Sequence, residues 1–411
     1  MARALMLSMA VAALLMVAHS VTADDGGGGE GLRVVGRYVN YFDPQGEIPD
    51  VELPELPPPP GAGIEAAPRQ VSAGYPDDPY DVCSQRVVRQ TGGDSVLRVL
   101  MLTRHGTDNL EAYLRYKLAY QVSADDGRSF GPVKPLIQQG DQYDLMHPLE
   151  PVRVGKNCAM ISSGMLMIEA SNGEIMLPIM IPPLDENGEY YNPAGAFTFS
   201  DAAVLIGQWV DDATDVIWEL GEVVRIDHEL STRGLDEPSI IETTRPGEFL
   251  MISRGSNDKR PELPGRKWIC TSRDWCRTWT QPQAWTYSDG TPLYSPSAHS
   301  VLVRSLANER LYWLGNTCDE NPGGNHPRYP LVIGEIDEET LGLIRDTVTV
   351  IDTRNPEIDS EIVQLSNFEV RQDEDGRLYV ILYRIDYGRR TEDGEYIPDR
   401  RSVYVIDVPE E

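Results

Sequence analysis

The stretch that decides the fold is SADDGRSF, residues 123–130, because its spacing returns in TSRDWCRTW, residues 271–279. The shared positions are Ser123, Asp125, Gly127 and Phe130 in the first copy and Ser272, Asp274 and Trp279 in the second. An Asp carboxylate can accept hydrogen bonds from turn amides, glycine allows a left-handed corner, and an aromatic ring packs between neighbouring units. A pattern that recurs at the same point of successive units is typical of a structural loop, so we interpret neither copy as a catalytic centre.

Short β-rich runs surround both copies and come in pairs. From residue 94 onward they are enriched in Val, Ile, Leu, Tyr and Trp, and segments with helical periodicity are almost absent. Five pairs can be recognised, and they begin with the runs SVLRVLMLTRHG, NGEIMLPIMI, GEFLMISRG, ERLYWLGNT and GRLYVILYRI. This succession predicts an all-β fold of radially repeated four-stranded antiparallel blades, a β-propeller, because no single unit can bury both of its faces alone.

The pattern S-x-D-x-G-x-[ST]-[FW] resembles the Asp-box, or BNR repeat, of the sialidase (neuraminidase) superfamily, and the resemblance covers residues 75–411. The first copy is complete, whereas the second has Cys276 where the family has glycine. The resemblance implies a six-bladed propeller whose Asp-boxes lie away from the catalytic face. Since only five units are clear, we expect the segment LRVVGRYVNYF, residues 32–42, to complete the sixth blade and close the ring.

The first 74 residues are expected to precede the propeller domain, which we place at residues 75–411. Residues 1–23 combine one early Arg with a short apolar run that ends in Val-Thr-Ala, which predicts a signal peptide cleaved near Ala23 rather than a membrane anchor. Residues 24–74 are rich in Gly and Pro and predict a flexible linker. We therefore expect a secreted or periplasmic protein without stable membrane insertion.

The charge balance is strongly acidic, with 36 basic and 65 acidic residues and a net charge of −29. Nucleic acids and anionic membranes both require a positive field, so we exclude them as partners. An anionic ligand would need a local basic pocket on this surface. The predicted partner is an acidic glycan or polysaccharide, and we expect the protein to be a monomer.

Five cysteines occur in the chain: Cys83, Cys158, Cys270, Cys276 and Cys318. In an exported protein this number predicts one or two disulfides and an odd thiol. A cross-strand bridge between Cys270 and Cys276 is conceivable, because the two flank a hairpin turn. Their spacing does not match metal-ligand patterns, so neither a metal nor a cofactor is predicted.

The sialidase resemblance also implies a site. In that family three arginines bind the sugar carboxylate, an Asp is the acid/base, and a Glu activates a Tyr nucleophile. The chemistry is reasonable because guanidinium forks recognise a planar carboxylate, and an ionised Glu can take a phenolic proton. The clearest match is GLDEPSIIETTRPGEFLMISRG, residues 234–255, where Glu237 and Arg254 resemble the family's Glu and second arginine.

The remaining arginines are assigned by their place in the repeat. Arg86, chosen over Arg89, corresponds to the first arginine of the family, although the family's Arg-Ile-Pro context is missing. Arg328, in NHPRYPLVIGEID, corresponds to the third. At the end of an apolar run, Arg104 and Asp108 resemble the family's subsite arginine and its acid/base Asp, and a surface loop is the alternative interpretation.

The family's nucleophilic Tyr has no counterpart at its expected place. The segment EIVQLSNFEVRQDEDG, residues 361–376, offers Asn367, Phe368 and Glu369 instead. Tyr294 or Tyr329 could replace it from a neighbouring loop. Further pocket candidates are His147, His299, His326 and Glu369, although each of the histidines is also compatible with a structural role.

Together these residues predict a glycoside hydrolase of the exo-alpha-sialidase type that acts on carboxylate-bearing glycans. One alternative is a non-catalytic propeller that binds glycan or protein, which the missing Tyr favours. Another is a lyase on uronate polymers, which needs a base and an acid such as a His and a Tyr near the arginines. The sequence Arg104-His105-Gly106 also resembles the nucleophile motif of histidine phosphatases, but those are α/β enzymes and this chain lacks the helices.

Overall fold

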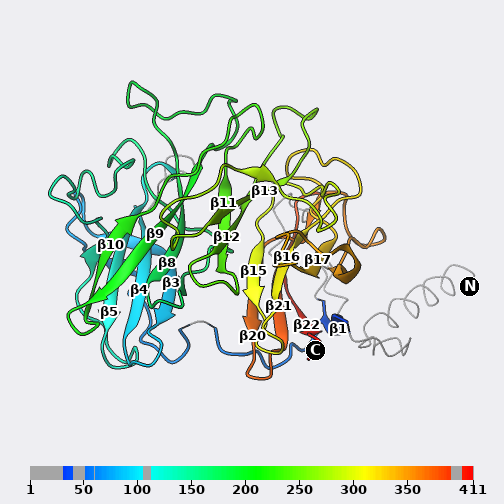
Figure 1. Ribbon diagram of the computed structural model, residues 1–411, viewed down its shortest axis with the longest axis horizontal. Helices are drawn as coiled ribbons and strands as arrows, with labels where there is room; N and C mark the ends of the chain where they lie inside the picture. Colours follow the sequence, from blue (N-terminus) through cyan, green and yellow to red (C-terminus); the bar gives the residue numbers. More distant parts are fainter. Residues whose placement is uncertain (1–30, 40–50, 60, 105–112, 390–399, 411) are drawn as a thin grey trace, which may run out of the picture.

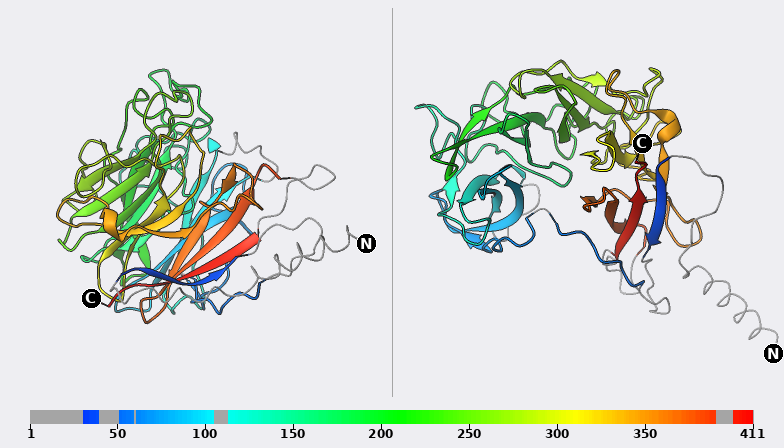
Figure 2. Two further views of the ribbon diagram at one scale, coloured as in Figure 1. Left: turned by 90° about the vertical axis from the view of Figure 1, so that its right-hand side faces the viewer. Right: turned by 60° about the horizontal axis from the view of Figure 1, so that its bottom comes forward.

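The computed structural model describes residues 31–39, 51–59, 61–104, 113–389 and 400–410. Within these ranges the elements are 22 strands and one short 3₁₀ helix, η1 (Arg345–Thr347). The strands form five antiparallel sheets that lie side by side around a common axis (Figures 1 and 2). This arrangement is a β-propeller, as the sequence predicts.

The sheets follow one another along the chain. The first contains β2 (Gln70–Val71), β3 (Tyr80–Arg89), β4 (Val96–Thr103), β5 (Lys117–Ser123) and β6 (Lys134–Pro135). The second contains β7 (Ile168–Glu169), β8 (Ile175–Ile181), β9 (Asp201–Val210) and β10 (Asp215–Leu220). The third contains β11 (Asp236–Glu242), β12 (Phe249–Arg254), β13 (Lys267–Ser272) and β14 (Gln283–Ala284).

The last two sheets complete the ring. The fourth contains β15 (Val301–Arg304), β16 (Leu311–Asn316), β17 (Leu331–Glu335) and β18 (Thr349–Asp352). The fifth contains β19 (Val363–Gln364), β20 (Phe368–Gln372), β21 (Leu378–Asp386), β22 (Arg400–Asp407) and β1 (Arg33–Tyr38). Each of the five pairs of β-rich runs in the sequence therefore supplies central strands of one sheet.

The prediction of six blades is wrong, because the described residues form five. The N-terminal segment expected to complete a sixth blade instead adds β1 to the fifth sheet, antiparallel to β22, with Arg33 opposite Asp407 and Tyr38 opposite Val403. The outer edge of β22 would otherwise present unpaired backbone groups, and β1 covers it. The first and last parts of the chain therefore share one sheet (Figure 2, right).

Apolar side chains pack between successive sheets. A cluster that includes Tyr120 and Trp218, whose ring centroids are 5.8 Å apart, joins the first sheet to the second. Further clusters join the second to the third, the third to the fourth and the fourth to the fifth. Among the described residues no such cluster joins the fifth sheet to the first, and we call this boundary the seam.

An extended segment crosses the seam, and we call it the N-terminal strap (residues 51–59 and 61–65; Figure 2, right). At the fifth sheet, Arg371 Nη1 of β20 donates to the carbonyl of Pro57 at 3.0 Å. At the first sheet, Arg98 Nη1 of β4 donates to the carbonyl of Glu65 at 2.8 Å. The strap and β1 both lie in the range that the sequence assigns to a linker, and they connect the two ends of the ring.

The loops at 123–130 and 271–279 have the same hydrogen-bond pattern. In the first, the Ser123 hydroxyl donates to Asp125 Oδ1 at 2.7 Å, and the Asp125 carboxylate accepts from the Ser129 amide at 2.8 Å and the Ser129 hydroxyl at 2.6 Å. The second loop repeats these contacts with Ser272, Asp274 and Thr278 at 2.8, 2.9 and 2.6 Å. Both carboxylates are therefore used by their own loops.

Cys276 occupies the corner that Gly127 occupies in the first loop. Gly127 has φ = 80° and Cys276 has φ = 65°, so the cysteine adopts a left-handed backbone that favours glycine. Its side chain is fully buried and belongs, together with Trp279, to the cluster between the second and third sheets. Burial of the thiol therefore accompanies an unfavourable backbone conformation.

The prediction of one or two disulfides is wrong. All five thiols are free in the structure, and Cys270 is not bonded to Cys276. Both side chains are buried in the apolar cluster between the second and third sheets, where they pack as small hydrophobic groups. No helix in the described part of the chain is long and apolar enough to cross a membrane.

Candidate functional site

One end of the propeller gathers the predicted charged residues. Glu237 lies at the start of β11 and Arg254 at the end of the adjacent antiparallel strand β12. Since β13 is antiparallel to β12, its last residue, Ser272, lies at the opposite end. The loop at 271–279 is therefore on the face away from Glu237 and Arg254.

Glu237 and Arg254 form a buried ion pair, with Glu237 Oε2 2.7 Å from Arg254 Nη1 and side chains that are 14% and 11% exposed. The other carboxylate oxygen accepts a hydrogen bond from the Ser162 hydroxyl at 3.0 Å. Burial alone would raise the pKa of Glu237, but the positive charges of Arg254 and Arg328 outweigh it and hold the pKa at about 2. Glu237 is therefore ionised at neutral pH.

The backbone of Glu237 is also unusual. Its φ is 46°, in the left-handed region that disfavours residues with a Cβ. Backbone conformations of this kind cost energy and concentrate at functional sites. The conformation coincides with a shift in the pairing register of β11 and β12 between Asp236 and Ser239.

Arg328 lies just before β17 and is 8% exposed. Its Nη1 donates to Gln364 Oε1 at 2.7 Å and Ser366 Oγ at 3.2 Å, and its Nη2 donates to the Ser297 carbonyl at 2.8 Å. Burial, together with the nearby charge of Arg254, lowers the pKa of Arg328 to about 9. The side chain remains a cation at neutral pH.

Ser297 and Asn325 connect the two arginines. Arg254 Nε donates to the Ser297 hydroxyl at 2.8 Å, while Arg328 uses the carbonyl of the same residue. The side-chain oxygen of Asn325 accepts from Arg254 Nη2 at 3.3 Å and from Arg328 Nη2 at 3.2 Å. The two guanidinium groups therefore share both partners.

Arg86, on β3 of the first sheet, reaches the same group through Ser162. Its Nε donates to the Met165 carbonyl at 2.6 Å, and its Nη2 donates to the Ser162 carbonyl. Ser162 in turn donates to Glu237. The structure therefore joins the three predicted arginines and the predicted Glu in one hydrogen-bonded chain, which we call the arginine site (Arg86, Ser162, Glu237, Arg254, Ser297, Asn325 and Arg328).

His299 lies beside the arginine site but is 3% exposed. Its ring packs against Phe368 with centroids 4.6 Å apart, and its Nε2 is 3.3 Å from the Phe368 carbonyl. Burial lowers the pKa of His299 to about 4, so the imidazole is neutral at neutral pH. The segment expected to hold a Tyr thus reaches the neighbourhood of the site, but it presents Phe368 there.

Lys267 is a cation beside the arginine site that sequence reasoning missed. It is fully buried at the start of β13, and its ammonium donates to the Ala298 carbonyl. Burial and the neighbouring charge of Arg254 lower the pKa of Lys267 to about 7. Its signal in the sequence is weak, since only its place at the head of the apolar run KWIC distinguishes it from a surface lysine.

The other predicted pocket residues have these contacts. His147 Nε2 is 3.0 Å from the Glu150 carbonyl, Glu369 pairs with Arg371 at 2.7 Å, and Arg104 is 3.4 Å from Asp77. Tyr294 forms a backbone bridge with Cys318, His326 pairs with Gly323, and the Tyr329 hydroxyl donates to the Glu361 carbonyl at 3.3 Å. None of these contacts involves the arginine site. Asp108 lies outside the described residues, as does the predicted signal peptide.

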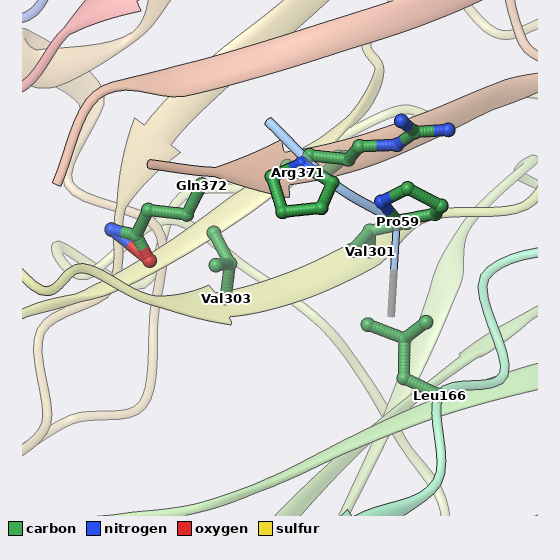
Figure 3. Close-up of a pocket in the computed structure, with 8 residues that line it drawn as sticks. Pro59, Leu166, Val301, Val303, Arg371 and Gln372 are labelled. Carbon is green, nitrogen blue, oxygen red and sulfur yellow. The ribbon is translucent and has the colours of Figure 1, made fainter. Parts of the chain in front are cut away.

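An apolar pocket of about 260 Å³ is lined by inner strands of the fourth and fifth sheets and by two loop segments (Figure 3). Its walls come from β15, β20, the strap and Leu166, namely Pro58, Pro59, Leu166, Val301, Val303, Val370, Arg371 and Gln372. The pocket lacks converging charges, so the arginine site remains the candidate functional site. No group of three or more His, Cys, Asp or Glu side chains that could hold a metal is found in the described ranges.

Asp201, at the start of β9, provides a test of electrostatics outside the arginine site. Its carboxylate is 3% exposed and pairs with Arg225, which is 66% exposed, at 2.8 Å. Burial raises the pKa of Asp201 to about 6, although Arg225 acts in the opposite direction. Because this pKa exceeds the unfolded value of about 3.9, ionised Asp201 opposes folding above about pH 6, and the effect disappears below about pH 4.

Asp201→Asn is therefore expected to raise the free energy of unfolding by about 1–3 kcal/mol at pH 8 and to have little effect near pH 4. Urea unfolding at both pH values measures the difference. The exposed Asp211→Asn is the matched control and is expected to change neither value. An equal effect of Asp201→Asn at the two pH values would contradict the assigned titration.

Comparisons with known proteins give similarity in fold alone. No protein-family model matches the chain, and no curated protein matches it in sequence. A protein of unknown function from Dyadobacter fermentans has a TM-score of 0.48 and 15% identity, over 79% of this chain and 75% of that chain.

Two sialidases are also among the matching structures. The Hadza microbial sialidase has a TM-score of 0.49 and 13% identity over 79% of this chain, and a sialidase from Streptococcus pneumoniae has a TM-score of 0.45 and 11% identity over 84% of this chain. The chain spans 52% and 58% of the length of these two sialidases. The solved structures that this chain resembles thus include sialidases with a β-propeller.

Proposed function

We propose that the protein is a sialidase-like glycoside hydrolase that acts on carboxylate-bearing glycans. The observation that carries this proposal is the buried pair of Glu237 and Arg254, joined through shared partners to Arg328 and through Ser162 to Arg86. Three cations gathered at one end of a protein with net charge −29 supply the local positive charge that an acidic ligand needs.

Each residue has a role in this proposal. Arg86, Arg254 and Arg328 hold the sugar carboxylate, since guanidinium groups form charge-assisted hydrogen bonds with it. Glu237, ionised because Arg254 holds its pKa at about 2, stabilises the positive charge that develops on the sugar ring in the transition state. Asp108 is the proposed acid/base: it gives its proton to the leaving oxygen, and its carboxylate then takes the proton of the water that attacks the sugar, which restores the acid.

The two loops at 123–130 and 271–279 support the family assignment independently of the site. Their shared pattern of Ser, Asp and Ser/Thr hydrogen bonds is the one we propose to be the Asp-box. We further propose that the chain is exported by its N-terminal signal sequence and that it acts on its glycan as a monomer.

The proposal is tested by hydrolysis of a fluorogenic α-sialoside by the full chain. Glu237→Gln keeps the shape of the side chain but removes its charge, so it is expected to reduce turnover at least 100-fold, a size typical of lost electrostatic stabilisation. The exposed Glu186→Gln is the matched control and is expected to retain full activity.

A panel of uronate polymers, monitored by the ultraviolet absorbance of unsaturated products, completes the experiment. Unsaturated products without sialic acid release would replace the proposal with a lyase. Binding of sialic acid or uronate with no reaction on either class of substrate would replace it with a glycan-binding propeller.

A further inference from the structure

Asn325 occupies an unusual position for a neutral side chain, because its Oδ1 bridges two cations. Arg254 Nη2 and Arg328 Nη2 lie 3.3 and 3.2 Å from this oxygen. The amide must present its oxygen here, since its NH₂ group would repel both guanidinium groups. Both hydrogen bonds are longer than the 2.7–2.9 Å that is usual for bonds between guanidinium groups and carboxylates.

The donors of Arg328 are nearly all used. Each terminal nitrogen of a guanidinium carries two N–H groups. Nη1 donates to Gln364 and Ser366, and Nη2 donates to the Ser297 carbonyl and Asn325. The remaining donor, Nε, is buried without a hydrogen-bond partner. A ligand carboxylate can therefore gain a terminal N–H of Arg328 only if one of these four acceptors leaves.

Asn325 is the acceptor that can leave most easily. Gln364 is 5% exposed, Ser366 is fully buried, and Ser297 is 1% exposed and accepts through its backbone. Asn325 is only half-buried. It therefore has solvent into which its side chain can turn.

The backbone around Asn325 is held independently of its side chain. Gly323 and His326 exchange two backbone hydrogen bonds, of 2.9 and 3.2 Å, around the turn. The Gly324 carbonyl accepts from the Ser297 amide at 2.8 Å, and the Gly324 amide donates to Asn257. Rotation of the Asn325 side chain leaves these contacts in place.

We propose that Asn325 holds the place of one oxygen of the ligand's carboxylate between Arg254 and Arg328 and is displaced when the ligand binds. The inference rests on the proposed function, because it assumes that the arginines bind a carboxylate. Displacement exchanges two long hydrogen bonds to a neutral amide for two bonds between opposite charges, which are shorter and stronger. Asn325 thus competes with the ligand and sets the affinity of the site.

Asn325→Ala is therefore expected to bind carboxylate sugars about ten-fold more tightly than the wild type, because the binding-competent state no longer has to displace an internal acceptor. Asn325→Asp is expected to bind them at least ten-fold more weakly, because its own carboxylate pairs with both arginines. Titration calorimetry of the full chain with N-acetylneuraminic acid and with glucuronic acid measures both changes. The exposed Asn187→Ala, whose side chain contacts Asp185, is the matched control and is expected to bind as the wild type does.

The outcomes separate this inference from the proposed function. If Arg254→Ala abolishes binding while Asn325→Ala binds no more tightly than the wild type, the proposed function stands and the role of Asn325 is overturned. If neither the wild type nor Asn325→Ala binds either acid, or if binding survives in Arg254→Ala, both are overturned.

If Asn325→Ala fails to fold, a second measurement on the wild type tests the displacement of Asn325. The side-chain amide signal of Asn325, identified by its absence from the NMR spectrum of Asn325→Asp, is expected to shift toward the position of a solvent-exposed amide as N-acetylneuraminic acid is added. An unchanged signal at saturating ligand would overturn the displacement.

Discussion

Arg254→Ala is expected to abolish carboxylate binding and to lower the free energy of unfolding by about 3–5 kcal/mol, the cost of breaking a buried ion pair from one side. Glu237 would remain in a site where its charge lacks its closest partner, 2.7 Å away in the wild type. The pKa of Glu237, held at about 2 by the arginines, would rise because burial then dominates. Calorimetric titration with sialic acid and denaturant unfolding measure the two losses.

Two variants locate the origin of the stability loss. In the double variant Arg254→Ala with Glu237→Ala, the uncompensated charge is gone, so part of the lost stability is expected to return. Arg260→Ala removes a partly exposed arginine from the connection between β12 and β13, where it pairs with the exposed Glu229 and Glu262. This variant is expected to unfold at the wild-type denaturant concentration. Retention of wild-type stability and ligand binding by Arg254→Ala would contradict the site described above.

Arg384→Met is expected to lower the free energy of unfolding by a similar amount, about 3–5 kcal/mol, without any direct effect on the arginine site. Arg384 lies on β21 and is 4% exposed. Its Nη1 donates to Asp352 Oδ2 at 2.6 Å, and its Nε donates to Asp359 Oδ1 at 3.2 Å. Burial alone would lower the pKa of Arg384, but Asp352 and its other acidic neighbours raise it.

The expected loss of stability is large because the carboxylates of Asp352 and Asp359 would remain without the arginine that pairs with them. Asp359 is 5% exposed and Asp352, the last residue of β18, is 13% exposed, so methionine would leave two buried acids without their cation. Urea unfolding measures the effect, with Arg377→Met as control. Arg377 lies at the far end of the same hairpin, is 46% exposed and pairs with the partly exposed Asp407, so its loss is expected to cost about 0–1 kcal/mol. If both substitutions lowered the free energy of unfolding equally, burial would not determine the strength of these ion pairs.

The fold was largely predictable because each sheet has its own local pattern. The apolar runs from SVLRVLM to GRLYVILY mark the central strands of all five sheets, and the period-two sheet pattern needs no distant information. The blade count was not predictable, since β1 pairs with β22 across more than 360 residues of sequence. A strand's partner depends on which sheet edge is exposed, and that is a property of the assembled ring.

The candidate site was also predictable only in part. Glu237 and Arg254 are neighbours across one hairpin, so local spacing brings them together. Ser162, Ser297 and Asn325 are small polar residues from three different connections, and their sequence surroundings resemble ordinary turns. Only the closure of the propeller places them between the arginines, which is why the sequence offers no signal for them.

The placement of β1 also has a mechanical consequence. Because Arg33 lies opposite Asp407, the chain enters the fifth sheet at the same end from which it leaves. Tension applied between the two ends would therefore peel β1 from β22 one hydrogen bond after another, instead of loading all of them together in shear. Next to yield would be the strap, so a small force would pull the ring open at the seam while the apolar clusters between the remaining sheets still resisted.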